Sequence, residues 1–404
     1  MSFDVAIVGG GMVGASLAVA LAPLKLSVAL IEAIPHNATA QPSFDERTTA
    51  LSNGSRRILE TIGVWPALNE LATPIAKIHV SDQGRFGFAR IDAREQGLSA
   101  MGYVVPNRAL GRALWSRLSS TDIKIFCPAE VSLLSVNDRA VNIEIAAAGA
   151  KTAIDAKLIV AADGAQSVVR SAFGIAAEVR DYDQTAVITT VLPQRFHDNV
   201  AYERFTPSGP LALLPLDGGR CTLVLTLSKD AAQSALAWSD AQFLAEVQRR
   251  FGFRLGRFLK VGRRVPYPLS LTQSERTSAQ RCVIIGNAAQ GLHPVAGMGF
   301  NLGLRDVASL AELIAENARS GADPGGAKLL SEYDAWRSAD RGGVIAFTDG
   351  LVRTFSNPSS LVARLRNLGL LAFDLLPPAK SALSRLSTGG GGRIPKLARG
   401  VALT

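Results

Sequence analysis

The chain has 404 residues, enough for one large or two modest domains, and its 48% hydrophobic content supports a substantial core. The formal net charge of +9 would suit a nucleic-acid binder, but the sequence contains no motif of that class. Its three cysteines, Cys127, Cys221 and Cys282, lie in apolar runs without metal-ligand spacing. They predict reduced, buried thiols and no metal site.

Residues 3–32 combine the parts of a dinucleotide-binding unit. An apolar run at 5–8 predicts a buried parallel strand, after which Gly9, Gly11 and Gly14 occupy the positions of a G-x-G-x-x-G motif. These glycines allow a tight turn, close approach of a pyrophosphate, and packing of the next helix, whose first N–H groups face the phosphates. A second apolar run at 28–31 ends at Glu32, whose carboxylate can accept hydrogen bonds from both hydroxyls of an adenosine ribose.

Residues 5–24 form an uncharged stretch that is long enough to span a bilayer as a helix. The glycines and the strand pattern predict a strand–helix–strand unit instead. The N-terminus contains Asp4 and no basic residue, which argues against a secretion signal. We therefore expect a cytoplasmic protein.

The rest of the chain alternates between mixed and β-rich stretches. Strands are expected at residues 75–81, 86–91, 103–105, 158–162, 186–192, 211–214, 222–227 and 282–285. Helices are expected at residues 52–63, 108–118, 241–250 and 302–318. A glycine-rich loop at 286–299 precedes the last of these helices.

These elements predict an α/β protein with a discontinuous dinucleotide-binding domain of residues 1–74, 98–180 and 272–345. A β-rich substrate domain of residues 75–97 and 181–271 is inserted into it. No second G-x-G-x-x-G follows a strand, so a second nucleotide would bind only transiently.

Residues 346–404 form a third, leucine-rich segment that is predicted to be helical and basic. Residues 351–404 hold one acid, Asp374, against eight basic residues: Arg353, Arg364, Arg366, Lys380, Arg385, Arg393, Lys396 and Arg399. Such a segment favours peripheral contact with an anionic membrane surface, here the inner face of the cytoplasmic membrane, or with a partner protein. A terminal helix packed on its own domain, with arginines in solvent, is the alternative.

Two further motifs accompany the glycine motif in a specific order: Ala-Asp-Gly-Ala-Gln-Ser-Val-Val-Arg at 162–170 and Ile-Gly-Asn-Ala-Ala at 285–289. The set resembles the single-component aromatic flavin hydroxylases, the class typified by p-hydroxybenzoate hydroxylase, over essentially the whole chain. The segments 45–52 and 286–306 are similar to the ubiquinone-biosynthesis branch, above all to its 2-polyprenyl-6-methoxyphenol hydroxylase subgroup.

The resemblance implies a Rossmann-like FAD-binding domain of the group A flavin monooxygenase type, with an inserted β-sheet substrate layer and a C-terminal helical segment. It also implies tightly bound, non-covalent FAD, NADPH as a transient reductant and O₂ as co-substrate. A flavin C4a-hydroperoxide would then attack a phenol ring.

By the resemblance, twelve positions contact or shape the cofactor site: Gly9, Gly11, Gly14, Glu32, Arg47, Arg108, Asp163, Gly286, Asn287, Gly297, Gly299 and Asn301. Arg47 and Arg108 would donate to phosphate or ribityl oxygens, although either can be an ordinary surface arginine. Asn287 stands where most of the wider family has Asp, which predicts weaker flavin retention. Asn301 is expected to begin a helix whose N-terminus stabilises negative charge on the flavin.

The candidate catalytic residues are His293, Pro294 and Tyr267. His293 and Pro294 occupy the positions that the family places on the substrate side of the flavin, and His293 is a candidate base for the phenol proton. A structural histidine, and core packing for Tyr267, are the alternatives. Arg170 is expected either to support the Asp163 turn or to form a salt bridge away from the cofactor.

The implied activity is hydroxylation of a polyprenylated phenol, 2-polyprenyl-6-methoxyphenol, para to its hydroxyl group. The alternatives are another ring position, a soluble aromatic acid bound by Arg180, Arg204 or Arg220, and a non-catalytic FAD-containing subunit that docks other ubiquinone-biosynthesis enzymes. The sequence does not indicate an oligomeric state.

Overall fold

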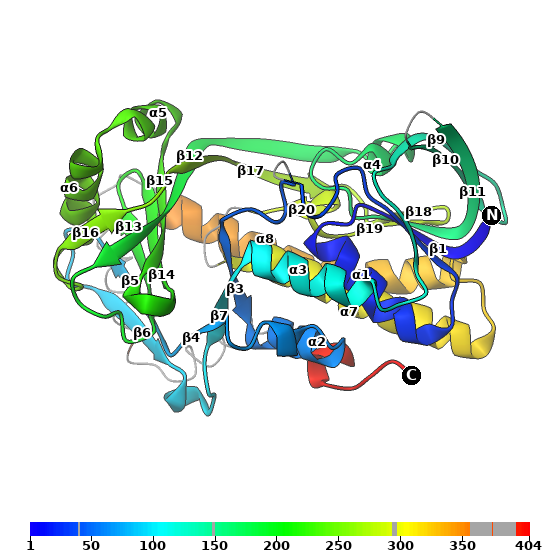
Figure 1. Cartoon of the computed structure of the whole chain (residues 1–404), viewed down its shortest axis with the longest axis horizontal. Helices are drawn as coiled ribbons and strands as arrows, with labels where there is room; N and C mark the ends of the chain where they lie inside the picture. The colour runs from blue at the N-terminus through cyan, green and yellow to red at the C-terminus, as the bar shows by residue number, and fades with distance from the viewer. Residues whose placement is uncertain (39–40, 148–149, 293–296, 356–373, 375–392) are drawn as a thin grey trace.

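The computed structural model describes residues 1–38, 41–147, 150–292, 297–355, 374 and 393–404. Within these residues the strands form sheets of eight, nine and three strands, and helices pack on the two larger ones (Figure 1). The expected α/β class is confirmed.

The eight-stranded sheet carries the predicted dinucleotide-binding unit. Its parallel strands lie in the order β19 (Cys282–Ile284), β11 (Ala150–Ala161), β1 (Ser2–Val8), β2 (Val28–Ile31) and β8 (Lys124–Phe126). One face packs against the helices α1 (Met12–Leu21), α3 (Asn107–Leu118), α7 (Met298–Ser320) and α8 (Ala327–Phe355). The other face packs against α4 (Val168–Ala172) and against β9 (Glu130–Val136) and β10 (Val141–Ala147), two strands of the same sheet that pair antiparallel in the order β9, β10, β11.

The uncharged stretch at 5–24 follows from this arrangement. Val5 and Ile7 of β1 pack toward α1 and α3, whereas Ala6 and Val8 pack on the opposite face. A strand that is buried on both faces has no position for a charged side chain. The helix α1 is buried over most of its length as well, so the strand–helix–strand prediction is confirmed. No described helix has the length and apolarity needed to cross a membrane.

The nine-stranded sheet has one face toward helices and one toward a cavity. Its order is β20 (Gln290–Gly291), β17 (Val265–Ser274), β12 (Ala177–Pro193), β15 (Cys221–Ser228), β14 (Gly209–Pro215), β13 (Val200–Thr206), β5 (Lys77–Asp82) and β6 (Phe88–Asp92), with β16 (Phe258–Val261) beside β12. Leu211 and Leu213 pack with residues of α5 (Lys229–Ala237) and α6 (Asp240–Phe251). Ala212 and Leu214, the alternate residues of the same strand, point to the other face and line the cavity.

The long strands β12 and β17 connect the part of the molecule that carries α5 and α6 with the part that carries β1 and α1 (Figure 1). They pair along most of their length. The expected domain boundaries at 180/181 and 271/272 fall inside these two strands, and the division into domains stays a prediction.

Two expected elements differ from those observed. The strand expected at 75–81 is split, because β4 (Thr73–Ile75) joins β3 (Thr48–Ser52) and β7 (Gly102–Pro106) in the three-stranded sheet before β5 begins. The helix expected from about 302 begins earlier, at Met298, because Gly297 adopts a φ of 61° as its N-cap. The helix cap expected at Ser52 is confirmed: its side chain accepts a hydrogen bond from the Ser55 amide in α2 (Asn53–Thr61).

The described end of the chain returns to the body of the protein. A short 3-10 helix, η7 (Leu397–Arg399), packs on α2, and Leu397 is buried. Arg393 and Lys396 form ion pairs of 2.9 and 3.3 Å with Glu312 and Glu316 of α7. These two basic side chains therefore pack on their own domain, which was the alternative to contact with a membrane or a partner protein. Arg364, Arg366, Lys380 and Arg385 lie outside the described residues.

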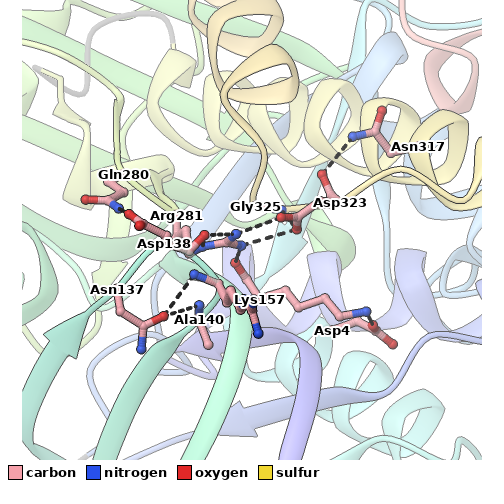
Figure 2. A network of polar contacts seen from close by, with 11 residues as sticks. Asp4, Asn137, Asp138, Ala140, Lys157, Gln280, Arg281, Asn317, Asp323 and Gly325 are labelled. Carbon is pink, nitrogen blue, oxygen red and sulfur yellow. Dashed lines mark hydrogen bonds and ion pairs between the residues drawn. The ribbon is translucent and has the colours of Figure 1, made fainter.

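A polar network ties the start of β19 to the connection between α7 and α8 (Figure 2). The Arg281 guanidinium donates to the backbone oxygens of Asp138 and Lys157 and pairs with Asp323 at 2.7 Å. Lys157 in turn pairs with Asp4 at 2.8 Å. Segments that are far apart in sequence are thus held together at the edge of the eight-stranded sheet away from the glycine motif.

A second buried network joins α7 and α8. The Arg337 Nε atom donates to Asp306 Oδ1 at 2.8 Å, and both side chains are at most 2% exposed. The other carboxylate oxygen of Asp306 accepts hydrogen bonds from the Gly286 amide at 3.0 Å and from Gln290 Nε2 at 2.6 Å. Asp306 thereby positions residues 286–290 directly after β19.

Replacing Arg337 by leucine is expected to lower the free energy of unfolding by about 3–5 kcal/mol, because Asp306 would stay buried without its cation. Chemical denaturation measures the loss. The control Lys151→Leu removes an ion pair to Glu144 in which the lysine is 69% exposed. Exposed pairs contribute at most about 1 kcal/mol. Equal losses in the two variants would contradict the assigned importance of the buried pair.

Candidate cofactor and substrate site

A cavity of about 1680 Å³ lies between the carboxyl ends of the parallel strands and the helix-free face of the nine-stranded sheet. Each sequence motif follows one parallel strand: Gly9 follows β1, Glu32 follows β2, Asp163 follows β11, and Gly286 follows β19. Since these strands are neighbours in one sheet, their carboxyl ends meet at one edge. Crevices at such edges are the usual ligand sites of open parallel sheets.

The glycine motif leaves no space for side chains. Gly9 has a φ of 101°, and a Cβ there would lie 2.4 Å from the Ala162 backbone oxygen. A Cβ on Gly14 would lie 1.9 Å from the Gly9 oxygen, so this glycine permits the helix to pack on the turn. Gly9 and Gly11 line the cavity, as does Met12 at the first position of α1. The N-terminal amides of α1 are therefore available to an anion.

Glu32 is 7% exposed and borders the same cavity. Its Oε1 atom accepts a hydrogen bond of 2.8 Å from the Ile34 amide, and its Oε2 atom accepts one from the Gly10 amide. Trp115 donates to the Gly10 oxygen at 3.2 Å. The carboxylate thus shapes the glycine turn as well as standing at the position expected for ribose binding.

Asp163 has one oxygen in use and one without a partner. Its Oδ2 atom accepts hydrogen bonds from the Val168 and Val169 amides at 2.9 and 3.3 Å. Its Oδ1 atom is buried and has no hydrogen-bond partner among the described residues. Burial also raises the pKa of this carboxyl group. A buried acceptor at the cavity wall fits a bound group that donates to it, as FAD or NADPH would.

Arg170 supports this turn. Its Nη1 and Nη2 atoms donate to the backbone oxygens of Ala288 and Ala165, both at 2.9 Å. Arg170 therefore links the segment after β11 to the segment after β19. Of its two expected roles, the structure favours support of the turn.

The two expected arginines have different environments. Arg47 lines the cavity, pairs with Asp45 at 2.5 Å, and lies over the ring of Tyr267, 4.8 Å from its centroid. Tyr267 lines the cavity from β17. Arg108 is absent from the described cavity lining and pairs with Glu46 at 2.5 Å on the surface. The arrangement brings Arg47 and Tyr267 together and leaves Arg108 apart.

The segment after β19 and the start of α7 form another part of the wall. Asn287, Gly297 and Gly299 line the cavity, whereas Gly286 lies behind it with a φ of 58°. Contrary to expectation, Asn301 does not begin the helix. It lies in the first turn, and its side chain is buried, with 3% exposed. Its amide group donates to the Ala50 and Gly297 oxygens and accepts from the Ser52 amide, so it ties β3 to the start of α7.

His293 and Pro294 lie outside the described residues, and their expected place on the substrate side stays a prediction. Two residues at this site were not predicted. Asp306 belongs to the motif segment but lacked an assigned role, and only its burial identifies it. Glu203 lines the cavity from β13, where the alternation Ala201, Glu203, Phe205 places a carboxyl group on an apolar face. That alternation was a signal present in the sequence.

Gly299→Ala is expected to weaken FAD binding about tenfold or more, because a methyl group would enter the cavity where the cofactor is expected. Among the described residues, no atom lies within 4 Å of a Cβ built at this position, so the apoprotein should unfold at an unchanged or slightly higher temperature. Titration of apoprotein with FAD and thermal unfolding measure the two effects. Gly342→Ala in α8, which is equally uncrowded, is the control; equal FAD affinity of both variants would contradict the placement.

Asn287→Asp is expected to raise flavin retention, because a carboxylate accepts a ribityl hydroxyl more strongly than an amide oxygen does. The flavin-to-protein ratio after extended dialysis measures retention. Asn287→Ala, which removes the acceptor, should lose flavin faster than the wild-type protein. A lower ratio in the aspartate variant than in the wild type would contradict the prediction.

Comparison with known proteins agrees with this geometry. A family model described as an FAD binding domain matches residues 2–348. The ubiquinone hydroxylase UbiL of Rhodospirillum rubrum is 40% identical over 99% of this chain and 93% of its own length. The 3-demethoxyubiquinol 3-hydroxylase of Escherichia coli is 32% identical over 92% of this chain and 94% of its own length.

The solved structure of p-nitrophenol 4-monooxygenase PnpA from Pseudomonas putida has a TM-score of 0.79. It is 19% identical and covers 97% of this chain and 100% of its own, which supports the fold. The three motifs meet at one cavity of about 1680 Å³, whose space and unpartnered Asp163 Oδ1 atom fit a bound FAD. The chain therefore belongs to the FAD binding domain family and is an FAD-dependent aromatic monooxygenase related to the ubiquinone hydroxylases.

Proposed function

We propose that this enzyme hydroxylates the aromatic ring of a polyprenylated phenol in ubiquinone biosynthesis. Its substrate would be 2-polyprenyl-6-methoxyphenol, hydroxylated para to the phenol group. Relatives named as ubiquinone hydroxylases support the pathway, and the resemblance of the segment 286–306 supports the ring position.

The observation that carries this proposal is the apolar surface that the nine-stranded sheet turns to the cavity. Its cavity-lining side chains include Ile78, Val80, Ile91, Ile188, Leu214 and Val224. A surface of this composition suits an isoprenoid tail and keeps water from the reacting atoms.

FAD, when bound, supplies the chemistry that activates O₂ with electrons from NADPH. The protein's own part is to hold and orient. The glycine turn and the first amides of α1 would hold the pyrophosphate, and Glu32 would accept the ribose hydroxyls. Asp163 Oδ1 would accept a hydrogen bond from the bound nucleotide, and the start of α7 would stabilise negative charge near the ring system.

A different ring position is the second candidate, because the name of the Escherichia coli relative specifies position 3. A soluble aromatic acid has less support. Arg180 pairs with Glu178 and Asp349, Arg220 pairs with Asp217, and Arg204 donates to the Arg250 oxygen. None of these arginines belongs to the described cavity lining, so an acid would lack the cation that was expected to bind it.

We also propose that the enzyme works in the cytoplasm, in peripheral contact with the membrane or with other enzymes of the pathway, through residues 351–404. The alternation of leucines and basic residues supports this contact. Arg393 and Lys396, which pair with α7, would contribute little to it.

Deletion of the gene in its host, followed by mass spectrometry of quinone precursors, tests the substrate. We expect a 2-polyprenylphenol, with or without its methoxy group, that lacks the hydroxyl para to the phenol. Complementation with the wild-type gene should remove it. A precursor that lacks a different hydroxyl would assign another ring position, and a normal quinone profile in a host without a second such gene would exclude the pathway.

A further inference from the structure

A continuous row of side chains crosses the cavity face of the nine-stranded sheet. Neighbouring strands pair Ala89 with Val80, Val80 with Glu203, Glu203 with Ala212, Ala212 with Val224, and Val224 with Ile188. All six residues line the cavity. Five of them are apolar, so Glu203 places one carboxyl group near the middle of an apolar wall.

The carboxyl group of Glu203 makes no hydrogen bond or ion pair with the described residues, unlike that of Glu32. The residue is half-buried, and desolvation by the surrounding protein raises the pKa of its carboxyl group to about 7. An isolated carboxyl group in such a place is costly unless something hydrogen-bonds to it. The wall does contain hydroxyl groups, such as those of Thr222 and Thr226, but no described side chain donates to Glu203. A donor to this carboxyl group is therefore left to the molecule that fills the cavity.

Charged groups on the neighbouring strands point elsewhere or pair with one another. On β5 and β6, Lys77 pairs with Asp92 at 3.0 Å, on the face opposite the cavity. His79 and Arg90 share that face, and burial together with Arg254, Arg90 and Arg204 lowers the pKa of His79 to about 4.

The remaining titratable groups are few. Asp82 is the last residue of β5, where it is paired with Phe205 of β13, and it is buried. By the alternation of the strand it belongs to the face that carries Val80. Arg204, next to Glu203 in the chain, donates to Ser81 and to the Arg250 oxygen on the far face. The strands β14 and β15 contribute no charged side chain to the cavity wall. Tyr267 of β17 lines the cavity, as does Tyr202 of β13, whose pKa is raised by burial.

We propose that Glu203 is a catalytic residue that accepts the hydroxyl proton of the phenol substrate. This role rests on the proposed function. It identifies Glu203 as the group that recognises the hydroxyl of the phenol substrate. In the step, the O–H bond of the phenol breaks and a new O–H bond forms on the Glu203 carboxylate. The electron pair left on the phenol oxygen is delocalised to the ortho and para carbons, which prepares the ring for attack by the electrophilic oxygen that the established activity supplies.

The test compares purified holoenzymes with Glu203→Gln and, as control, Glu178→Gln on the surface of β12. A short-chain 2-prenylphenol is the substrate, and hydroxylated product is measured from pH 5.5 to 9. Because the base acts as its carboxylate, kcat/KM of the wild type should rise with pH through about 7 and then level off. In Glu203→Gln it should be about 10²–10⁴-fold lower and lack this rise, whereas Glu178→Gln should match the wild type.

A binding measurement gives a second readout that does not depend on turnover. Flavin absorbance changes report the affinities of oxidised enzyme for the prenylphenol and for its O-methyl ether, which has no proton to donate. The wild type should prefer the phenol at least tenfold, and Glu203→Gln should lose most of that preference.

The variant is expected to fold. A carboxyl group whose pKa is raised on folding costs stability as the pH rises from its unfolded pKa near 4.5 to about 7, and glutamine removes that cost. Thermal unfolding of Glu203→Gln at pH 8 should therefore occur no lower than for the wild type.

The outcomes separate the two proposals. Hydroxylation by the wild type with an unchanged pH profile and phenol preference in Glu203→Gln would overturn the role of Glu203 and leave the proposed function intact. A wild-type enzyme that neither binds nor hydroxylates prenylphenols would overturn the proposed function, and the role of Glu203 with it.

Discussion

The site depends on the buried carboxylate of Asp306. This one group accepts a backbone hydrogen bond from Gly286, a side-chain hydrogen bond from Gln290 and a charge-assisted bond from Arg337. Burying both charges is expensive, and removing either partner costs more than the intact pair contributes. Such a pair is better suited to fixing one arrangement of α7, α8 and the segment after β19 than to adding stability. Asn287, which lines the cavity, is the residue after Gly286, whose backbone amide Asp306 holds in place.

The cavity then combines two surfaces with opposite chemistry. The carboxyl edge of the parallel sheet supplies a glycine turn, helix N-terminal amides, the Glu32 carboxylate and the unpartnered Oδ1 atom of Asp163, which suit phosphates and riboses. The nine-stranded sheet supplies a face of aliphatic side chains, because its period-two alternation sends every second residue toward α5 and α6. A polar cofactor and an apolar substrate can therefore occupy one cavity, each against the wall that suits it.

Much of the fold could be predicted because its signals are local. The glycine motif and the two apolar strands around α1 lie within thirty residues, and the cap at Ser52 depends on its own helix. The start of α7 at Met298 could not be predicted in this way, since it depends on the left-handed conformation of Gly297. The split of the strand at 75–81 follows from pairing of β4 with β7, a contact between distant segments.

The site was predicted unevenly for the same reason. Residues in motifs, such as Gly9, Asp163 and Asn287, were found at the cavity. Asn301 was expected to begin α7 but lies in its first turn, and its partners Ala50 and Ser52 are about 250 positions away in the chain. Its role toward the cofactor stays a prediction. The ion pairs of Arg393 and Lys396 with α7 likewise require the end of the chain to return to the core, which no sequence pattern announces.

The strand β12 runs from the part of the molecule that carries the nucleotide-binding sheet to the part that carries α5 and α6 (Figure 1). A β-bulge in its pairing with β17 separates these two lengths of the strand. Its pairing with β17 steps from Asp181 opposite Ser270 to Gln184 opposite Leu269, so β12 carries two extra residues there. Beyond this bulge, a one-residue insertion would exchange the side chains that face α5 and α6 with those that face the cavity. An insertion at the bulge would instead be absorbed locally. The bulge is thus the point at which β12 can change length while the parts of the strand on either side of it keep their register, so that the faces turned to the cofactor and to the substrate need not change together.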